Sequence, residues 1–476
     1  MIDQAHANDS ETFRDSISTI SKEGKRAWIY PKKPKGPLHT KRIYVSIVLL
    51  ILMFTSPFMK VNGHPLMMFN VIERKFFVFG ITFWPQDFFL FVLAMLTFIV
   101  FIILFTAIFG RVWCGWACPQ TIFMEMVFRK IEYWIEGDYM QQKALNNSEW
   151  NTEKIIKKVG KNFIFFLLSF LIANTFLAYI IGIDEMKLLV TDGPGKHVSG
   201  FISLTAFTAI FYGVYVRFRE QVCLVVCPYG RLQGVLLDRN SVVVAYDYKR
   251  GEQRGKFHKH EKRELGDCVD CKLCVNVCPT GIDIRNGTQL ECINCTACID
   301  ACNSIMDNVG FKRGLIRYTS ENAIIKKQKF KITPRVIGYS IILVLLLSTL
   351  STLLAFRSDV ETTVLRTPGQ LFQQVGEDKV SNLYNIQLVN KTFHDLDISL
   401  RLKSPQGEIK YVGSEITTLK KDSLVEGVFF LVLPKDEIHK TKTRIRMEVV
   451  SGGKVIDEVK TNFLGPVDDE DDSDGD

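Results

Sequence analysis

The chain has 476 residues, a formal net charge of +8 and 47% apolar residues, many of them gathered into long runs. A chain of this length exceeds what one hydrophobic core supports, so the composition argues against a single soluble domain. The apolar runs indicate a membrane protein that carries further domains.

Residues 1–42 are polar and precede the first apolar run. The stretch YPKKPKGP at 30–37 is basic and interrupted by prolines. Such a segment is typical of a solvated tether that approaches anionic lipid. We therefore expect a solvated basic arm before the first span.

Five apolar runs are long enough, or nearly so, to cross a bilayer. They lie at about 43–59, 84–109, 163–183, 198–216 and 336–356. The first resembles a signal-peptide core, but it begins past residue 40 and lacks a small-residue cleavage site, so we interpret it as a retained span. Residues 43–216 are thus expected to hold four membrane helices, and 336–356 the fifth.

Lysine and arginine alternate in number between the segments that flank these runs. There are nine in 1–42, three in 60–83, eight in 110–162, two in 184–197 and twenty-one in 217–335. Because cytoplasmic loops carry the excess of positive charge, the N-terminus and 217–335 are expected in the cytoplasm. Residues 357–476 then lie outside, in the periplasm of a Gram-negative cell. The twelve cysteines agree, since all fall in or beside segments assigned to the reducing side.

Two copies of a C-x-x-x-C-P motif follow the second and the fourth span. RVWCGWACPQ at 111–120 contains Cys114 and Cys118, and QVCLVVCPYG at 221–230 contains Cys223 and Cys227. The equivalent positions suggest a repeated helical hairpin. On a helix, the four-residue spacing would place both thiols of a motif on one face. Four thiolates gathered in this way would suit copper(I) or an additional iron–sulfur centre.

Small cysteines can also fill helix contacts, and one such pair would favour that interpretation. Two copies of the motif, in a chain that also has a cysteine-rich run at 268–302, favour a redox or metal role instead. Arg111 and Arg219 could lower the pKa of the neighbouring thiols or bind lipid phosphate, but anchoring at the membrane interface is favoured for both. Trp113 and Trp116 are likewise expected to be interfacial anchors in preference to electron relays.

Eight cysteines within 268–302 have the spacing of a two-cluster ferredoxin, in which the fourth cysteine of each run ligates the other cluster. The first cluster is assigned to Cys268, Cys271, Cys274 and Cys302, and the second to Cys292, Cys295, Cys298 and Cys278. Zinc ribbons pair two C-x-x-C units across a longer gap and have no third cysteine in each run. The second run lacks the usual trailing proline, since Asn303 follows Cys302. Residues 217–335 are therefore predicted to hold two 4Fe–4S clusters, and SVVVAYDY at 241–248 to include a strand.

Several classes of function are disfavoured by what the sequence lacks. No histidine lies within a predicted span, which argues against a membrane b-type haem. No G-x-G-x-x-G opens a plausible nucleotide site and no Walker loop is present.

Residues 357–467 have a different character. NIQLVN at 385–390, DLDISLRL at 395–402 and RIRMEVV at 444–450 alternate apolar and polar residues, as half-buried strands do. Several short strands in about 100 residues suggest an immunoglobulin-like sandwich. Residues 468–476 form an acidic tail that is expected to be disordered.

The predicted fold is a multi-domain membrane protein. It combines a five-helix transmembrane bundle, an inserted bacterial-type two-cluster ferredoxin of the α+β class, and a C-terminal all-β immunoglobulin-like sandwich. This order, together with WCGWACPQ and CPYGRLQG, resembles the cytochrome c oxidase accessory protein family, called CcoG, FixG or RdxA, over nearly the whole chain.

The resemblance implies a role in assembling the cbb-type haem–copper oxidase of the bacterial inner membrane, with reduction of Cu(II) to Cu(I) before delivery. The protein would then be a cupric reductase, an oxidoreductase acting on metal ions. Cys114, Cys118, Cys223 and Cys227 would take part in that reaction, and the eight ferredoxin cysteines would hold the clusters. The implied partners are a cytoplasmic electron donor, copper-delivery proteins and oxidase subunits, and no nucleic acid.

Two other classes of function stay open. A membrane ferredoxin subunit could pass electrons to or from quinone or a periplasmic reductase. A non-enzymatic scaffold could bind copper or an assembly intermediate.

Overall fold

The computed structural model describes residues 19–20, 25–61, 64–70, 75–78, 80–192, 195–257, 264–327, 332–369, 371–438 and 440–466. The predicted acidic tail at 468–476 lies outside these residues, as does most of 1–24. The chain divides into two compact units. The first holds the residues up to Lys60, Pro65–Asn70 and Val92–Ser348, and the second holds Val61–His64, Val71–Phe91 and the residues from Thr349 onward.

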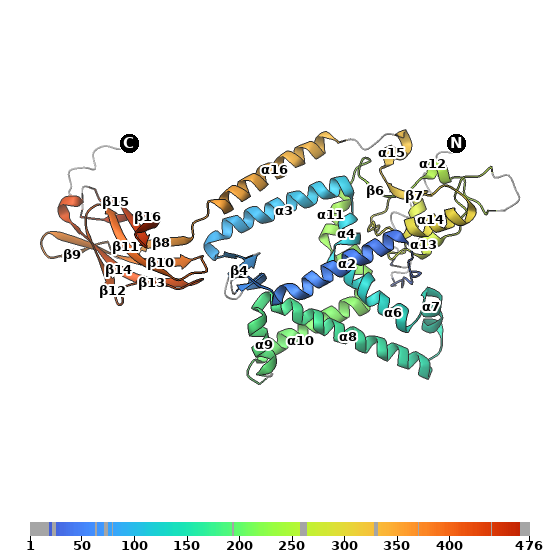
Figure 1. Ribbon diagram of the computed structural model, residues 1–476, viewed down its shortest axis with the longest axis horizontal. Coiled ribbons are helices and arrows are strands. Elements are labelled where there is room, and N and C mark those ends of the chain that lie inside the picture. Colours follow the sequence, from blue (N-terminus) through green and yellow to red (C-terminus); the bar gives the residue numbers. More distant parts are fainter. Residues whose placement is uncertain are drawn as a thin grey trace. The chain divides into compact units, whose positions relative to one another are not determined.

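Five helices in the described part of the chain are long and apolar enough to cross a membrane, as the sequence predicts. They are α2 with the turn η1 (Pro37–Phe58), α3 (Phe88–Phe109), α8 (Thr152–Ile181), α10 with the turn η4 (Val198–Phe218) and α16 (Pro334–Ala355). Figure 1 shows α8 and α10 packed against each other, both in green. A short helix, α9 (Ile183–Thr191), separates them along the chain.

Two of these helices begin earlier than the apolar runs suggest. α2 starts at Pro37, a residue suited to the first helical position, and the Asp300 carboxylate accepts hydrogen bonds from two N–H groups of its first turn. α8 starts at Thr152 with Asn151 as its N-cap. Its first turns carry lysines that are paired with glutamates, so charge in this segment does not prevent it from being helical.

Short helices connect the spans within the first unit. After α3 come α4 (Val112–Trp116), α5 (Pro119–Ile122), the π-helical turn η3 (Phe123–Phe128), α6 (Arg129–Ile135) and α7 (Tyr139–Asn147). After α10 come the π-helical turn η5 (Val222–Val226) and α11 (Pro228–Leu236). Cys118 and Cys227 are the N-caps of α5 and α11, each followed by proline at the first helical position. The expectation of both thiols on one continuous helix is therefore wrong, because the backbone is extended at Cys118 and at Cys227.

The iron–sulfur domain joins α11 to α16. Its elements are β6 (Val243–Tyr246), α12 (Tyr248–Gly251), α13 (Leu273–Asn276), η6 (Ile284–Asn286), α14 (Ala297–Val309), β7 (Ile316–Thr319) and α15 (Glu321–Lys326). β6 and β7 pair antiparallel, with Val243 opposite Thr319. This pair confirms the predicted strand within 241–248. The core of the domain includes Val244, Met306 and Leu315 together with the cluster-loop cysteines.

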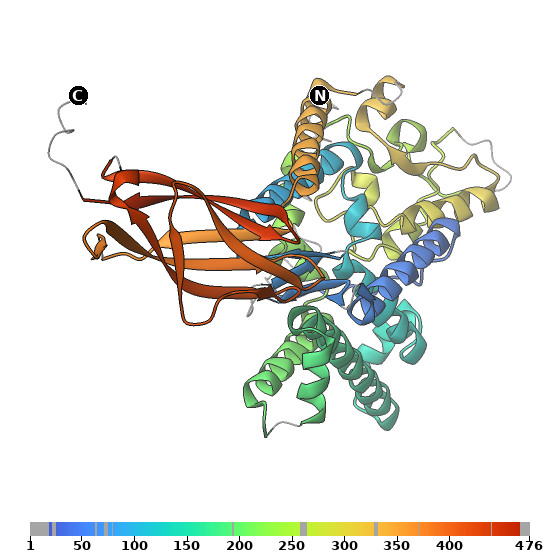
Figure 2. The same ribbon diagram turned by 60° about the vertical axis from the view of Figure 1, so that its left-hand side comes forward.

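The second unit contains two facing sheets, drawn in orange and red in Figure 2. One sheet has the order β12-β14-β10-β8 with β9 beside β10, and the other has the order β13-β11-β15-β16. The strands are β8 (Val360–Arg366), β9 (Gln373–Val375), β10 (Lys379–Asn390), β11 (Leu396–Ser404), β12 (Glu408–Val412), β13 (Thr418–Leu419), β14 (Leu424–Pro434), β15 (Lys442–Ser451) and β16 (Lys454–Leu464). Tyr384, Phe429 and Phe463 fill the core between them. All three segments predicted as strands are strands.

Short strands lie on the loop between α2 and α3. They are β1 (Lys60–Val61), β2 (His64–Pro65), β3 (Met67–Asn70), β4 (Lys75–Val78) and β5 (Ile81–Phe83), followed by the turn η2 (Pro85–Asp87). Within the second unit, Asp87 pairs with Lys391 at 2.7 Å and with Arg357. This buried ion cluster connects the end of the loop to the sandwich.

Candidate iron–sulfur and thiol site

The eight ferredoxin cysteines surround two separate cavities. The first, about 360 Å³ with its open mouth included, is lined by Cys268, Cys271, Cys274 and Cys302. The second, about 340 Å³ measured in the same way, is lined by Cys278, Cys292, Cys295 and Cys298, and Cys274 also reaches it. These are the two sets that the spacing predicts, with the fourth cysteine exchanged between the runs.

The two cysteine loops share an unusual backbone conformation. Asp270 and Lys272 have positive φ in the first loop, and Asn294 and Thr296 have positive φ at the matching positions of the second. Left-handed residues in alternation turn a chain sharply and direct N–H groups inward, which favours a bound anion. The loops are therefore bent so that three sulfurs of each run face one cavity.

The two cavities differ in their surroundings. Cys271 is exposed at the first cavity, where Arg285 forms ion pairs with Asp270 and Asp283. The second cavity is more enclosed. Cys278 there accepts hydrogen bonds from several backbone N–H groups, and the Thr280 hydroxyl lies 3.4 Å from its sulfur.

The donor sets fit two cubic clusters. In the described part of the chain, no three His, Cys, Asp or Glu side chains converge on a point where a lone metal ion would sit. The sulfurs instead line a volume, which is the arrangement that a cluster needs and a zinc ion does not. Burial raises the pKa of the Cys274 and Cys292 thiols to about 12. Cluster binding must therefore displace protons from both.

The first membrane-side motif rests on the loop around the second cavity. A Cβ at Gly115 would lie 2.4 Å from the carbonyl oxygen of Ile293, so glycine is required for this approach. The carbonyl oxygen of Gly115 accepts a 2.5 Å hydrogen bond from Arg42 Nε, a buried side chain of α2. Cys114 packs against an apolar cluster of Val277, Ile293, Cys295, Ala297 and Ala301, and Cys298 packs against the same cluster. One motif thiol thus lies against the core that holds a predicted ligand of the second iron–sulfur cluster.

Two residues expected at the membrane interface lie inside this contact. Trp116 Nε1 donates to the hydroxyl of Tyr318 at 3.2 Å, and that hydroxyl donates to the Asn294 carbonyl oxygen. Arg111 is 5% exposed and donates to the Leu290 carbonyl oxygen. Their role as interfacial anchors was predicted wrongly, because both side chains pack against the iron–sulfur domain.

The second motif meets the first from the other side. Gln233 of α11 donates to Cys114 Sγ at 3.6 Å. A Cβ at Gly230 would lie 2.6 Å from the Cys223 carbonyl oxygen, so α11 folds tightly back over its own motif. Burial, together with the neighbouring motif thiols, raises the pKa of Cys114 to about 11 and that of Cys223 to about 12. The four thiols lie in one region, on two separate segments of chain.

Comparisons with known proteins agree over nearly the whole chain. Residues 218–321 match the family model for a 4Fe-4S dicluster domain, 91–137 that for a 4Fe-4S binding domain, and 350–466 that for the Ig-like fold at the C-terminus of FixG, a putative oxidoreductase. Protein RdxB of Cereibacter sphaeroides is 30% identical over 468 residues, covering 92% of this chain and 96% of RdxB. The chain belongs to the FixG/RdxA family.

Two further relatives match shorter parts. Protein RdxA of Cereibacter sphaeroides is 32% identical over 80% of this chain and 83% of its own length. Nitrogen fixation protein FixG of Rhizobium meliloti is 36% identical over 62% of this chain and 58% of its own length. A crystal structure of a FixG-related protein from Vibrio parahaemolyticus, 20% identical, covers 23% of this chain and 98% of that chain, with a TM-score of 0.20.

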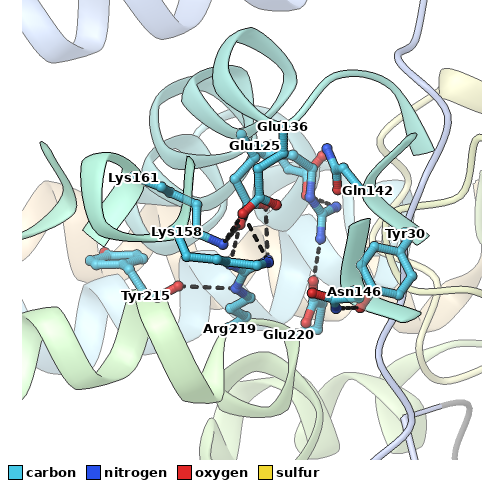
Figure 3. Close-up of polar contacts among 12 residues, drawn as sticks. Tyr30, Glu125, Glu136, Gln142, Asn146, Lys158, Lys161, Tyr215, Arg219 and Glu220 are labelled. Atoms are coloured by element: carbon cyan, nitrogen blue, oxygen red, sulfur yellow. Dashed lines mark hydrogen bonds and ion pairs between the residues drawn. The ribbon is translucent and has the colours of Figure 1, made fainter. Parts of the chain in front are cut away.

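In this FixG/RdxA-family protein, a buried ion network connects the two motif segments (Figure 3). Arg219, just before the second motif, donates two hydrogen bonds to Glu132 of α6. Arg129 of α6 bridges Glu125 to Glu220. At the start of α8, Lys158 and Lys161 each lie 2.9 Å from Glu136. These groups are the ones that sequence reasoning missed.

Arg219 shows what this network holds in place. Its φ is +46°, a left-handed conformation that is strained for a non-glycine residue. Arg219 Nε also donates to the Tyr215 carbonyl oxygen at 3.1 Å, and the side chain is 9% exposed. The buried ion pair with Glu132 therefore fixes the turn that leads into Cys223, and the expected membrane anchoring of Arg219 was wrong.

Residues 25–36 of the N-terminal arm make specific contacts with the rest of the first unit, although Lys25, Trp28, Lys33 and Lys35 stay exposed. The guanidinium carbon of Arg26 lies over the Trp28 ring, 3.7 Å from the ring centroid. The Tyr133 hydroxyl donates to the Pro31 carbonyl oxygen at 3.0 Å, and Lys32 N donates to the Asn276 carbonyl oxygen at 2.7 Å. The arm thus joins α6 to the iron–sulfur domain, which its basic composition did not reveal.

Proposed function

We propose that this membrane iron–sulfur electron-transfer protein reduces Cu(II) to Cu(I) for the assembly of a cbb-type cytochrome c oxidase. One observation carries the proposal: Cys114 packs against the apolar cluster that contains Cys295, a predicted ligand of the second cluster, and the next residue, Gly115, closely approaches the Ile293 carbonyl oxygen. A soft thiol set beside an electron-transfer centre suits a metal ion whose reduced form prefers sulfur.

The exposure of the two cavities suggests the direction of electron transfer, from the first cavity through the second to the motif thiols. The bound clusters supply one-electron transfer between a cytoplasmic donor and the membrane-side thiols. Cys271 is the exposed cysteine of the first cavity, so a soluble donor can approach there. The second cavity is enclosed, with Cys292, Cys295 and Cys298 lining it beside the first motif.

The copper-binding step falls to Cys114, Cys118, Cys223 and Cys227. Thiolates favour Cu(I) over Cu(II), which makes reduction more favourable and retains the product. No lone-ion site of three such ligands is preformed among the described residues, so the proposed ion would be held by a pair of thiols or by a rearranged set. Membrane insertion with 217–335 in the cytoplasm and the sandwich in the periplasm is part of the proposal. Copper-delivery proteins and oxidase subunits are the proposed partners.

The test replaces the four motif cysteines together. Protein with Cys114, Cys118, Cys223 and Cys227 changed to serine is purified without oxygen, reduced, and mixed with Cu(II). Its iron content and EPR spectrum are compared with those of the wild type. We expect unchanged iron and loss of Cu(I) formation, measured with a Cu(I)-specific chelator.

Other outcomes separate the competing functions. A loss of about four irons per chain would place a third cubane at the four thiols, in keeping with the 4Fe-4S model matched by 91–137. Wild-type rates of Cu(I) formation in the variant would refute the proposal. Reduction of quinone by the wild-type protein, indifferent to copper, would favour the membrane ferredoxin function.

A further inference from the structure

A cleft opens beside the second motif and is not part of either cluster cavity. It measures about 1450 Å³ with its open mouth included. Cys223 and α11 form one side, and residues 288–291 form the other. Residues 288–291 directly precede Cys292, a predicted ligand of the second cluster. The cleft therefore lies between the Cys223 segment and the segment that leads into Cys292.

A buried cation lines the cleft. Arg111 is 5% exposed, and its Nε has no hydrogen-bond partner. Among the described residues, Arg111 donates a hydrogen bond to the Leu290 carbonyl oxygen and forms no ion pair. Burial raises the pKa of the Cys114 and Cys292 thiols, and the charge of Arg111 opposes that rise at both. A guanidinium buried without a carboxylate is costly, and a negatively charged ligand would offset that cost.

The rest of the lining favours an anion of small size. Arg231 of α11 is exposed and lines the same cleft, and Glu291 is the acidic residue of the lining, so the three charged side chains sum to +1. Leu224, Leu237 and Leu290 supply apolar walls. Guanidinium groups bind carboxylate and phosphate oxygens through two parallel N–H donors. A neutral carbonyl oxygen forms a weaker hydrogen bond with a guanidinium than these charged oxygens do.

We propose that this cleft binds a small anion bearing carboxylate or phosphate groups, held by Arg111 and Arg231 next to the Cys223 thiol. Resting on the proposed function, the anion is the chelator that carries Cu(II) to the motif thiols. The cleft then sets which copper complexes are accepted.

Equilibrium dialysis of radiolabelled citrate against the anaerobic full-length protein tests the binding, with inorganic phosphate as competitor. We expect Arg111→Gln to raise the Kd about tenfold or more, since a buried charged hydrogen bond is lost. Arg231→Gln should raise it about two- to fivefold, as for an exposed ion pair. Arg239→Gln is the matched control, because Arg239 lies just beyond α11 and outside the cleft lining, and it should leave the Kd unchanged.

Competition identifies the anion. Displacement of citrate by phosphate indicates a general oxyanion site, and lack of displacement indicates a carboxylate site; both support the inference. Equal citrate binding by the wild type, Arg231→Gln and Arg239→Gln would overturn it even if Arg111→Gln fails to fold. Displacement of citrate by a neutral quinone analogue but by neither phosphate nor another carboxylate would overturn it as well.

A second measurement separates this inference from the proposed function. Under the proposed function, Arg231→Gln should raise the KM for anionic Cu(II)–citrate about two- to fivefold and leave the KM for a cationic Cu(II)–ethylenediamine complex unchanged. Citrate binding without any copper reduction would refute the proposed function alone. Copper reduction with no citrate binding would refute the cleft assignment alone.

Discussion

Gly115→Ala tests the contact on which the proposed electron path depends. The added Cβ would lie 2.4 Å from the Ile293 carbonyl oxygen and 3.0 Å from the Asn294 carbonyl carbon and oxygen. Ordinary contact begins at 3.4 Å, so the motif must move by about 1.0 Å, the difference between 3.4 and 2.4 Å. The clash involves backbone, which cannot rotate away as a side chain can.

The displacement should have two consequences. Overpacking of this kind costs about 1–3 kcal/mol of folding free energy. A shift of about 1 Å in a reacting geometry can slow a reaction by up to about 100-fold, so Cu(I) formation should fall by at least tenfold. Iron content should stay at the wild-type value, because every predicted cluster ligand is intact.

The assay measures three quantities on one preparation: iron per chain, thermal unfolding, and the rate of Cu(I) formation. Gly160→Ala is the matched control, since a Cβ there meets nothing within 4 Å and lies in helix α8. It should be neutral or slightly stabilising. A Gly115→Ala protein with wild-type stability and rate would refute the close approach of the motif to the cluster loop.

Three further substitutions probe other contacts. Thr280→Val removes the hydroxyl 3.4 Å from Cys278 Sγ, and the loss of about 1 kcal/mol should lower the potential of the second cluster by about 40 mV in an EPR redox titration. Asp300→Asn weakens the cap on α2 and should cost about 1 kcal/mol in unfolding, whereas the exposed Asp307→Asn on the same helix α14 should not. Asp87→Asn removes the carboxylate that pairs with buried Arg357 and leaves buried Lys391 paired with Glu361, and it should cost about 3 kcal/mol at pH 7, measured by hydrogen exchange in the sandwich. Burial alone would raise the pKa of Asp87, but hydrogen bonds and the charges of Lys391 and Arg357 outweigh it and lower that pKa. The ionised carboxylate therefore stabilises the fold above the usual pKa of an aspartate, and this stabilisation is lost as pH falls through the lowered pKa. The stabilities of the wild type and the variant should converge in strong acid.

The features predicted well from the sequence are those with a fixed spacing. The interval between Cys268 and Cys302 restricts which thiols can share a cluster, because a short loop reaches three corners of a cube and the fourth corner needs a distant sulfur. Long apolar runs and alternating strands likewise follow from periodicity alone. These local patterns were sufficient to predict the spans, the cluster domain and the sandwich.

The buried ion network could not be found in this way. Glu125 and Arg129 have the four-residue spacing of a helical ion pair, which was the one local signal available. Glu132, however, pairs with Arg219, which lies 87 residues further along the chain, and no local sequence pattern predicts that pair. A lysine or arginine beside an apolar run was interpreted as facing lipid headgroups, although here its partner is a glutamate from another helix.

The two C-x-x-x-C-P motifs look equivalent in sequence and share the same N-cap geometry, yet the structure gives them different neighbours. Cys114 packs against the apolar cluster that contains Ile293 and Cys295 of the second cluster loop. Cys223 lines the open cleft instead, and Arg111 lies at the junction of the two environments. Under the proposed function, an electron would enter from the enclosed side and an ion from the open side, and the unequal placement of the two motifs would serve that division. The iron–sulfur insert takes part in both environments: Ile293 and Asn294 pack closely against the first motif, and residues 288–291 form the wall of the cleft opposite Cys223.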